Sequence, residues 1–145
     1  MRFVGIDFGR KRIGMSISDA TAFLARPWQT VPVAGADPET AAALIADFFP
    51  RLMNEAESVD GIVIGLPRKL NGEDTDQTAD VRVFAKQLEM ITAIDVYLVD
   101  ERLTSVEAEQ QLAAREKDWK KRKQQIDAVA ATIILQDFLD SRVRG

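Results

Sequence analysis

Four carboxylates in this chain stand where acids are uncommon. One interrupts an apolar, strand-like run, two follow directly after another such run, and one stands at the start of an apolar helical pattern. They are Asp7, Asp100, Glu101 and Asp127. Asp7 interrupts an otherwise apolar run, and a buried carboxylate is costly unless it has a partner, a metal ion or solvent. Carboxylate oxygens are the ligands that the hard cations Mg²⁺ and Mn²⁺ prefer. The acids therefore predict a site for a divalent cation.

The composition narrows the chemistry further, because the 145 residues include no histidine and no cysteine. This excludes a Ser-His-Asp triad, a cysteine nucleophile, a histidine base, a zinc site built from imidazole and thiolate, and a disulfide framework. Carboxylates, lysines and hydroxyl groups remain. A chemical site in this chain would have to use these groups, and Mg²⁺ or Mn²⁺ would be the natural partner of its carboxylates.

Each acid also has a structural explanation. Asp7 could accept backbone hydrogen bonds from the turn at Gly9. Asp100 and Glu101 could be ordinary surface acids. Adjacent strand residues point to opposite faces, so at most one of the two should face a site, and their position alone does not decide which. Asp127 shares a helical stripe with apolar residues and is expected to point inward, although an acid in a first turn could merely complement the helix dipole, and Asp137 falls in the same stripe.

Basic residues are concentrated in three segments. The run 115–123 has a net charge of +4, which leaves the rest of the chain at −8, and it contains Trp119 as a potential stacking platform for a base. Two shorter loops add Arg10, Lys11, Arg12, Arg68 and Lys69. Each could be ordinary solvated charge. If the fold brings them around the acids, a cationic rim around a metal-binding floor would suit a phosphodiester substrate.

The elements that must position these residues follow from hydrophobic periodicity. Alternation predicts a β-hairpin from residues 3–8 and 13–17, followed by a third strand at 28–33 despite Pro27 and Pro32. Apolar runs at 62–66 and 96–99 predict strands covered on both faces, with a helix at 80–89 between them.

Three further helices are predicted. Asp37 and Pro38 start one that Pro50 should kink or end. A capping box at Thr104 and Glu107 starts another, which runs through Leu112, and the last helix should begin near Ile126. The order predicts a single α/β domain over residues 1–145, with three antiparallel strands, two parallel strands and flanking helices. The polar connection 65–78 is long enough to suggest a functional or mobile loop.

The N-terminus carries Asp7 where an export signal would need an unbroken apolar core, and no stretch is apolar and long enough to span a bilayer. We therefore expect a cytoplasmic protein with no membrane partner.

Four motifs in this order resemble the YqgF (RuvX) family. They are VGIDFGRKRIGMSISD, IVIGLPRKLNGEDTDQTADVRVFAKQL, VYLVDERLTSVEA and IDAVAATIILQDFLD, and the resemblance extends from about Phe3 to Asp140. It implies an RNase H-like fold, which agrees with the predicted order of elements. Members are described as nucleases that process pre-16S ribosomal RNA or as Holliday-junction resolvases.

The resemblance also implies a carboxylate triad of Asp7, Glu101 and Asp127, which favours Glu101 over Asp100. The implied mechanism is phosphodiester hydrolysis with two divalent ions, Mg²⁺ or Mn²⁺, in which Asp7 bridges the ions and the other two acids complete their shells. Expected nucleic-acid contacts are Arg10, Lys11, Arg12, Arg68, Lys69, Arg102, Lys120, Lys121, Arg122 and Lys123.

The expected substrate is structured RNA, with pre-16S rRNA in ribosomal particles the leading case. The first alternative is a junction-specific DNA endonuclease acting on branched DNA, which would require a homodimer because two symmetric cuts need two sites. The second is a non-catalytic RNA-binding or transcription-associated module. A sugar-kinase-like ATP-binding protein is disfavoured by the length of the chain.

Overall fold

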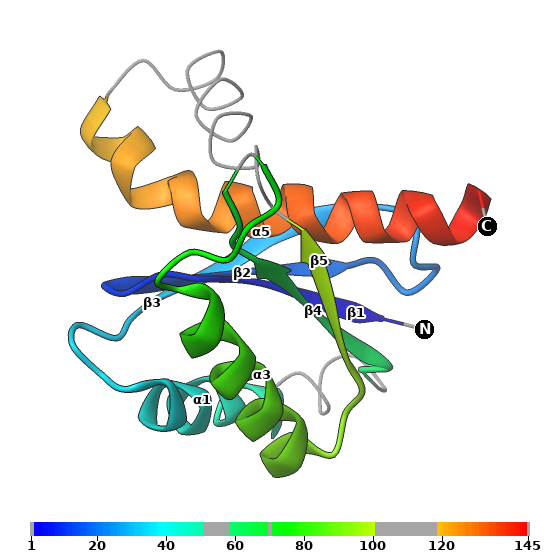
Figure 1. Cartoon of the computed structure of the whole chain (residues 1–145). Helices are drawn as coiled ribbons and strands as arrows, with labels where there is room; N and C mark the ends of the chain where they lie inside the picture. Colours follow the sequence, from blue (N-terminus) through cyan, green and yellow to red (C-terminus); the bar gives the residue numbers. More distant parts are fainter. Residues whose placement is uncertain (1, 51–58, 70, 101–118, 145) are drawn as a thin grey trace.

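A five-stranded mixed sheet forms the centre of the molecule (Figure 1). The computed structural model describes residues 2–50, 59–69, 71–100 and 119–144, and for 119–127 and 143–144 it describes the backbone alone. The described elements are β1 (Phe3–Phe8), β2 (Arg12–Ser18), β3 (Ala25–Pro32), α1 (Pro38–Ala46), β4 (Gly61–Leu66), α3 (Thr78–Thr92), β5 (Val96–Asp100) and α5 (Trp119–Arg144).

The strand order is β3-β2-β1-β4-β5. Strands β1, β2 and β3 pair in antiparallel fashion, whereas β4 is parallel to β1 and β5 is parallel to β4. The predicted mixed sheet is confirmed. The run 96–99 forms β5 as predicted, but β5 is not covered on both faces, because it lies at the edge of the sheet and is partly exposed. Because β1, β4 and β5 run in the same direction, their carboxyl ends lie at the same end of the sheet.

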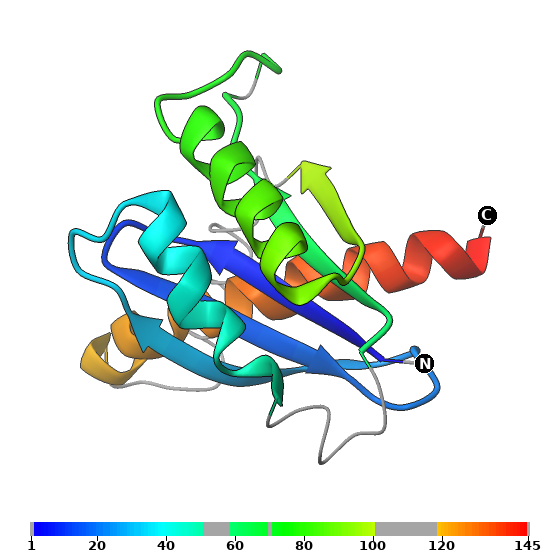
Figure 2. The ribbon, with the colours of Figure 1, turned by 90° about the horizontal axis from the view of Figure 1, so that it is seen from below.

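Helices α1 and α3 cover one face of the sheet, and α5 crosses the other (Figures 1 and 2). The alternation of β1 divides its residues between the two layers. Val4, Ile6 and Phe8 belong to the large core cluster that includes residues of α1 and α3. Phe3 instead packs with Ile134, Leu135 and Leu139 of α5. Asp7 has the same parity as Phe3 and therefore belongs to the α5 face.

Strand β3 begins and ends earlier than the sequence predicts, at Ala25 and Pro32 instead of Trp28 and Val33. The ladder with β2 shifts register here: Met15 pairs with Gln29 but Ser16 pairs with Pro27, so Trp28 is the extra residue of a bulge. Both prolines fit within the strand because β3 lies at the edge of the sheet, where a missing amide hydrogen is tolerated.

Two helix predictions need correction. Helix α1 has the predicted cap, in which the Asp37 carboxylate accepts a hydrogen bond of 2.7 Å from the Thr40 amide, but it ends at Ala46, before Pro50. Helix α5 is already formed at Trp119, earlier than the predicted start near Ile126. The intervening Lys, Arg and Gln residues are good helix formers, and no Gly or Pro separates them from the apolar stripe.

The middle helix α3 extends beyond the predicted 80–89 at both ends. The helix predicted to open at Thr104 lies outside the described residues. Among the helices that are described, none has a stretch that is both long enough and apolar enough to cross a bilayer.

Candidate active site at the carboxyl ends of the central strands

Asp7 is the described member of the predicted carboxylate triad. It is the next-to-last residue of β1, is half-buried, and has an interaction partner. Its cross-strand neighbour on β2 is Gly14. On the other side, Ile6 pairs with Ile64, so Gly65 is the β4 residue at the level of Asp7. The carboxylate is therefore flanked on both neighbouring strands by residues without a side chain.

Helix α5 runs antiparallel to β1 along the face that carries Asp7 (Figure 1). Near the start of β1, the ring of Phe3 lies 5.4 Å from that of Phe138, measured between centroids. Two residues later, a Cβ atom placed on Gly5 would lie 2.7 Å from the carbonyl oxygen of Ala131 and from Cβ of Leu135. Contacts thus move toward the N-terminus of the helix as β1 advances toward Asp7.

Asp127 lies on α5, one helical turn before Ala131, and its side chain is outside the described part. The apolar stripe predicted beside it is confirmed for Ala131 and Ile134, which are buried. Asp137, which the same pattern placed in the stripe, is exposed instead. The long helix does not keep every residue of that wide stripe against the sheet.

Asp100 is the last residue of β5, where it is exposed and pairs with Leu66 of β4. Val99 packs with the α5-facing cluster, so alternation assigns Asp100 to the opposite face. Glu101 and Arg102 lie outside the described residues. Within the described part of the chain, no group of three acids could hold a metal ion.

The turn between β1 and β2 depends on Gly9, because a Cβ atom there would lie 2.3 Å from the carbonyl oxygen of Arg12. Arg10 and Lys11 are exposed in this turn, and Arg12 is half-buried and partnered. The first turns of α5, which carry Lys120, Lys121, Arg122 and Lys123, lie at the same end of the molecule (Figures 1 and 2). Two of the three predicted basic segments thus share one end.

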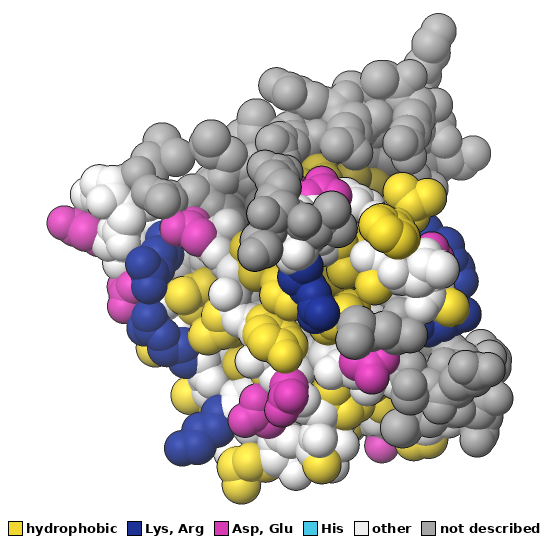
Figure 3. All heavy atoms as spheres, turned by 90° about the vertical axis from the view of Figure 1, so that its right-hand side faces the viewer, with side chains coloured by type: hydrophobic (Ala, Val, Ile, Leu, Met, Phe, Trp, Pro, Cys, Tyr) yellow, Lys and Arg dark blue, Asp and Glu magenta, His cyan; other side chains and the backbone are white. Residues whose placement is uncertain are grey.

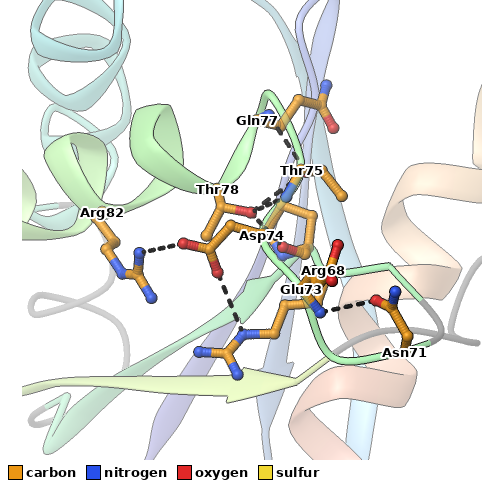
Figure 4. Close-up of polar contacts among 9 residues, drawn as sticks. Arg68, Asn71, Glu73, Asp74, Thr75, Gln77, Thr78 and Arg82 are labelled. Atoms are coloured by element: carbon orange, nitrogen blue, oxygen red, sulfur yellow. Dashed lines mark hydrogen bonds and ion pairs between the residues drawn. The ribbon is translucent and has the colours of Figure 1, made fainter.

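The connection after β4, which the sequence predicts only as a long loop, contains a small hairpin (Figure 4). Arg68 and Asp74 form an antiparallel bridge, and the Lys69 amide donates to the Glu73 carbonyl over 2.8 Å. Gly72 has a φ of 89°, which favours glycine. The Asn71-Gly72 pair is the sequence signal that could have revealed this turn.

Two hydrogen-bonding groups attach the hairpin to the rest of the fold. The Asp74 carboxylate bridges two guanidinium groups, with Arg82 of α3 at 3.1 Å and Arg68 Nε at 3.9 Å (Figure 4). The buried hydroxyl of Thr78 donates to the Pro67 carbonyl and accepts from the Thr75 amide, both at 2.7 Å. Arg68, a predicted nucleic-acid contact, is therefore already ion-paired.

At the other end of the sheet, the turn after β2 is organised by Asp19. Its carboxylate accepts hydrogen bonds from the Thr21 hydroxyl and from the amides of Phe23 and Leu24. These bonds, the Thr21 bond first, lower the pKa of Asp19 from 3.8 to about 2.

On the face that Figure 3 shows, hydrophobic side chains and charges of both signs are interspersed. The Lys and Arg side chains of this face form separate groups beside apolar and acidic side chains.

Relatives of known sequence match nearly the whole chain. A protein of Chloroflexus aggregans is 45% identical over 139 residues, covering 96% of this chain and 93% of its own. Proteins of Protochlamydia amoebophila and Bacillus thuringiensis are 38% and 37% identical, covering 97% and 98% of this chain and 94% and 100% of their own. All three carry the name "Putative pre-16S rRNA nuclease".

Solved structures share the fold. RuvC of Thermus thermophilus in complex with a Holliday junction superposes with a TM-score of 0.54 at 12% identity, covering 99% of this chain and 96% of its own. A ROK hexokinase of the same organism has a TM-score of 0.52 at 25% identity, but the match covers 77% of this chain and 38% of the hexokinase. The RNase H-like fold predicted from the sequence is confirmed by the RuvC match.

A family model described as "RuvX: Holliday junction resolvase" matches residues 1–141. With this match and relatives of 37–45% identity over nearly their full length, the chain belongs to the RuvX family.

Proposed function

We propose that this protein is a nuclease that hydrolyses phosphodiester bonds in the 5′-end processing of pre-16S rRNA. The observation that carries the proposal is the position of Asp7. It lies on the α5 face, near the carboxyl ends of the parallel strands and between two glycines. Open α/β sheets bind their ligands at these strand ends. The names of the relatives and the RuvC-like fold support the same activity.

The proposed catalytic residues are Asp7, Glu101 and Asp127. For Asp127 the support is the packing of α5 on β1. Two strand residues advance about 6.6 Å, which equals about four residues of a helix at 1.5 Å each. The step from Gly5 to Asp7 therefore corresponds to the step from Ala131 back to residue 127. For Glu101 the support is the family resemblance, with which the assignment of Asp100 to the other face agrees.

The donor set fits a hard divalent cation, because it contains carboxylate oxygens and the chain has no imidazole or thiolate. Asp7 would be shared by two Mg²⁺ or Mn²⁺ ions, and Glu101 and Asp127 would complete their ligand shells. Such ions supply a water of lowered pKa and stabilise charge on the leaving oxygen. The carboxylates would hold the ions and orient them, and no histidine base is required.

The RNA backbone would contact the end of the molecule where two basic segments meet. Arg10 and Lys11 lie in the turn after β1, Arg12 begins β2, and the first turns of α5 carry Lys120, Lys121, Arg122 and Lys123. Arg102 and Lys69 remain predicted contacts. Arg68 is a weaker one, because it pairs with Asp74 and the segment 68–82 has four acids and three basic residues.

We infer one nuclease domain over residues 1–145 that acts in the cytoplasm.

The proposal is tested by cleavage of end-labelled precursor 16S rRNA and of a four-way DNA junction, with Mg²⁺, Mn²⁺ or EDTA. Asp7→Asn is compared with Asp95→Asn, a matched change at an exposed acid that precedes β5 at the other end of that strand. We expect RNA cleavage that requires the metal, is lost by several orders of magnitude in Asp7→Asn, and is kept in Asp95→Asn.

The second candidate is a Holliday-junction resolvase, which the family description favours. It predicts symmetric cuts in the DNA junction and a homodimer in sedimentation. If neither substrate is cut and both proteins bind RNA equally, the catalytic proposal is wrong and the basic segments define a binding module.

A further inference from the structure

We propose that Ser16 is a positioning residue of the carboxylate site. Its hydroxyl fixes the position of α5 along β1, and at this position residue 127 lies at the level of Asp7. This inference rests on the proposed function, since it assumes that those two acids share a metal site. Ser16 itself would touch neither metal nor substrate.

Ser16 makes a direct hydrogen bond between sheet and helix. Its side chain is fully buried, and Oγ donates to the carbonyl oxygen of Ala131 over 2.7 Å. A carbonyl oxygen has two lone pairs, so Ala131 can accept this bond in addition to the one within its helix. A buried hydroxyl without a partner would be destabilising, so the helix is favoured at the position where this bond forms.

Gly5 makes the same contact very close. Gly5 and Ser16 are cross-strand partners, and a Cβ atom on Gly5 would lie 2.3 Å from Ser16 Oγ and 2.7 Å from the Ala131 carbonyl oxygen. The helix therefore rests on the backbone of β1 at this point. No long, flexible side chain lies between them that could absorb a displacement.

The contact lies one step away from the two acids. Asp7 follows Gly5 by two residues on the same face of β1, and residue 127 precedes Ala131 by one helical turn. A shift of α5 at Ala131 would reach residue 127 almost undiminished. Metal ligands tolerate deviations of only a few tenths of an ångström, so the position of this contact bears directly on ion binding.

Ser18 provides a matched control within the same strand. It lies on the same face as Ser16 and is equally buried. Its Oγ, however, accepts from the Phe3 amide at 2.9 Å and donates to the Asp19 carbonyl at 3.0 Å, so it bonds within the sheet and its turn and not to α5. Replacing either serine by alanine removes one buried hydroxyl, but only one change releases the helix.

The first experiment measures Mn²⁺ binding by calorimetry to the wild type, Ser16→Ala, Ser18→Ala and Asp7→Asn, at a temperature where circular dichroism shows all four folded. We expect Ser16→Ala to raise the Kd by about 10- to 100-fold, as for other groups that orient metal ligands. Ser18→Ala should bind as the wild type does, and Asp7→Asn should lose binding.

The outcomes separate the two proposals. If Asp7→Asn binds Mn²⁺ normally, the proposed carboxylate site is wrong. If Asp7→Asn loses binding while Ser16→Ala binds normally, or while both serine variants weaken binding equally, the positioning role is overturned. Should Ser16→Ala not fold, Ser16→Cys, whose thiol is only a weak hydrogen-bond donor, tests the same contact: an increased Kd supports the role and an unchanged Kd contradicts it.

A second measurement reports the position of α5 without metal. The chain has no cysteine, so spin labels can be placed at Arg26→Cys in β3 and Ser141→Cys in α5, both exposed positions. In EDTA, we expect Ser16→Ala to shift or broaden the distance distribution and Ser18→Ala to leave it unchanged. Identical distributions for both variants and the parent would contradict a positioning role.

Discussion

The two faces of the central strands differ in composition although alternate residues of the same strands form them. The face toward α1 and α3 presents the large apolar residues Val4, Ile6, Phe8, Ile13, Met15, Ile17, Ile62, Ile64 and Leu66. The face toward α5 presents Phe3, Gly5, Asp7, Gly14, Ser16, Ser18, Gly61, Val63 and Gly65. One face is a continuous apolar core, and the other is mostly small, polar or acidic.

This difference separates stability from function within single strands. The apolar face buries large side chains against two helices and supplies most of the hydrophobic free energy. The small residues of the other face allow α5 to approach the backbone closely and leave Asp7 without bulky neighbours on β2 and β4. A substitution in β1 should therefore mainly reduce stability on the apolar face, and mainly reduce activity at the adjacent position on the other face.

The largest effect is expected from Ile6→Asp, which moves a carboxylate by one residue onto the apolar face. Ile6 is fully buried among apolar side chains, and an unpaired charge there costs several kcal/mol. We expect no cooperative thermal transition at neutral pH, as measured by circular dichroism. A stable Ile6→Asp protein would show that this face tolerates a charge and is not a rigid apolar core.

A smaller loss is expected for Ile64→Ala on the same face of β4. The side chain is fully buried, and truncation at such positions destabilises by about 2–5 kcal/mol. Urea denaturation should show this loss, while the cleavage rate per folded molecule stays at the wild-type value. A reduced rate in fully folded protein would mean that the two faces are not functionally separate.

Asp74→Ala tests the hairpin beside the site. Its ion pairs are largely exposed, so we expect a stability change below about 1 kcal/mol. Release of Arg68 and Arg82 should speed hydrogen exchange of the Lys69 and Gly72 amides. Asp95→Asn serves as the control. Unaltered exchange in the hairpin would show that Asp74 does not hold it.

The smallest effect is expected for Asp19→Ala, at the end of the sheet away from the site. Because the pKa of Asp19 is lowered from 3.8 to about 2, the charged form favours folding at pH values above about 4. This contribution is lost as the pH falls through 2. Thermal melts should therefore show the variant less stable than the wild type at pH 7, with the difference shrinking between pH 4 and pH 2.

The sequence predicted the features that depend on local periodicity. The alternation around Ile13 to Ile17 specified a strand, the apolar run at 62–66 specified a strand buried on both faces, and Asp37 with Pro38 specified the start of α1. Asp7 was identifiable as a candidate because a charge inside an apolar run is visible without a structure. In these cases the local signal and the tertiary environment agree.

The sequence did not reveal features that depend on contacts between distant residues. Pro27 argued against a strand at a position that the edge of the sheet tolerates, and the helix formers before Ile126 looked like a charged loop. The contact of Gly5 and Ser16 with Ala131 joins residues more than a hundred positions apart. Its proposed role in placing Asp127 could not have been inferred before the packing of α5 was known.

The two prolines of β3 have a consequence for association between molecules. An exposed edge strand invites pairing with another chain through its free amide hydrogens. Residues 27 and 32 have none, and the bulge at Trp28 interrupts the regular spacing that a second strand would need. The sheet is thereby closed to extension on the β3 side, which protects a chain with an exposed Phe23 and Leu24 in the preceding turn from edge-to-edge aggregation.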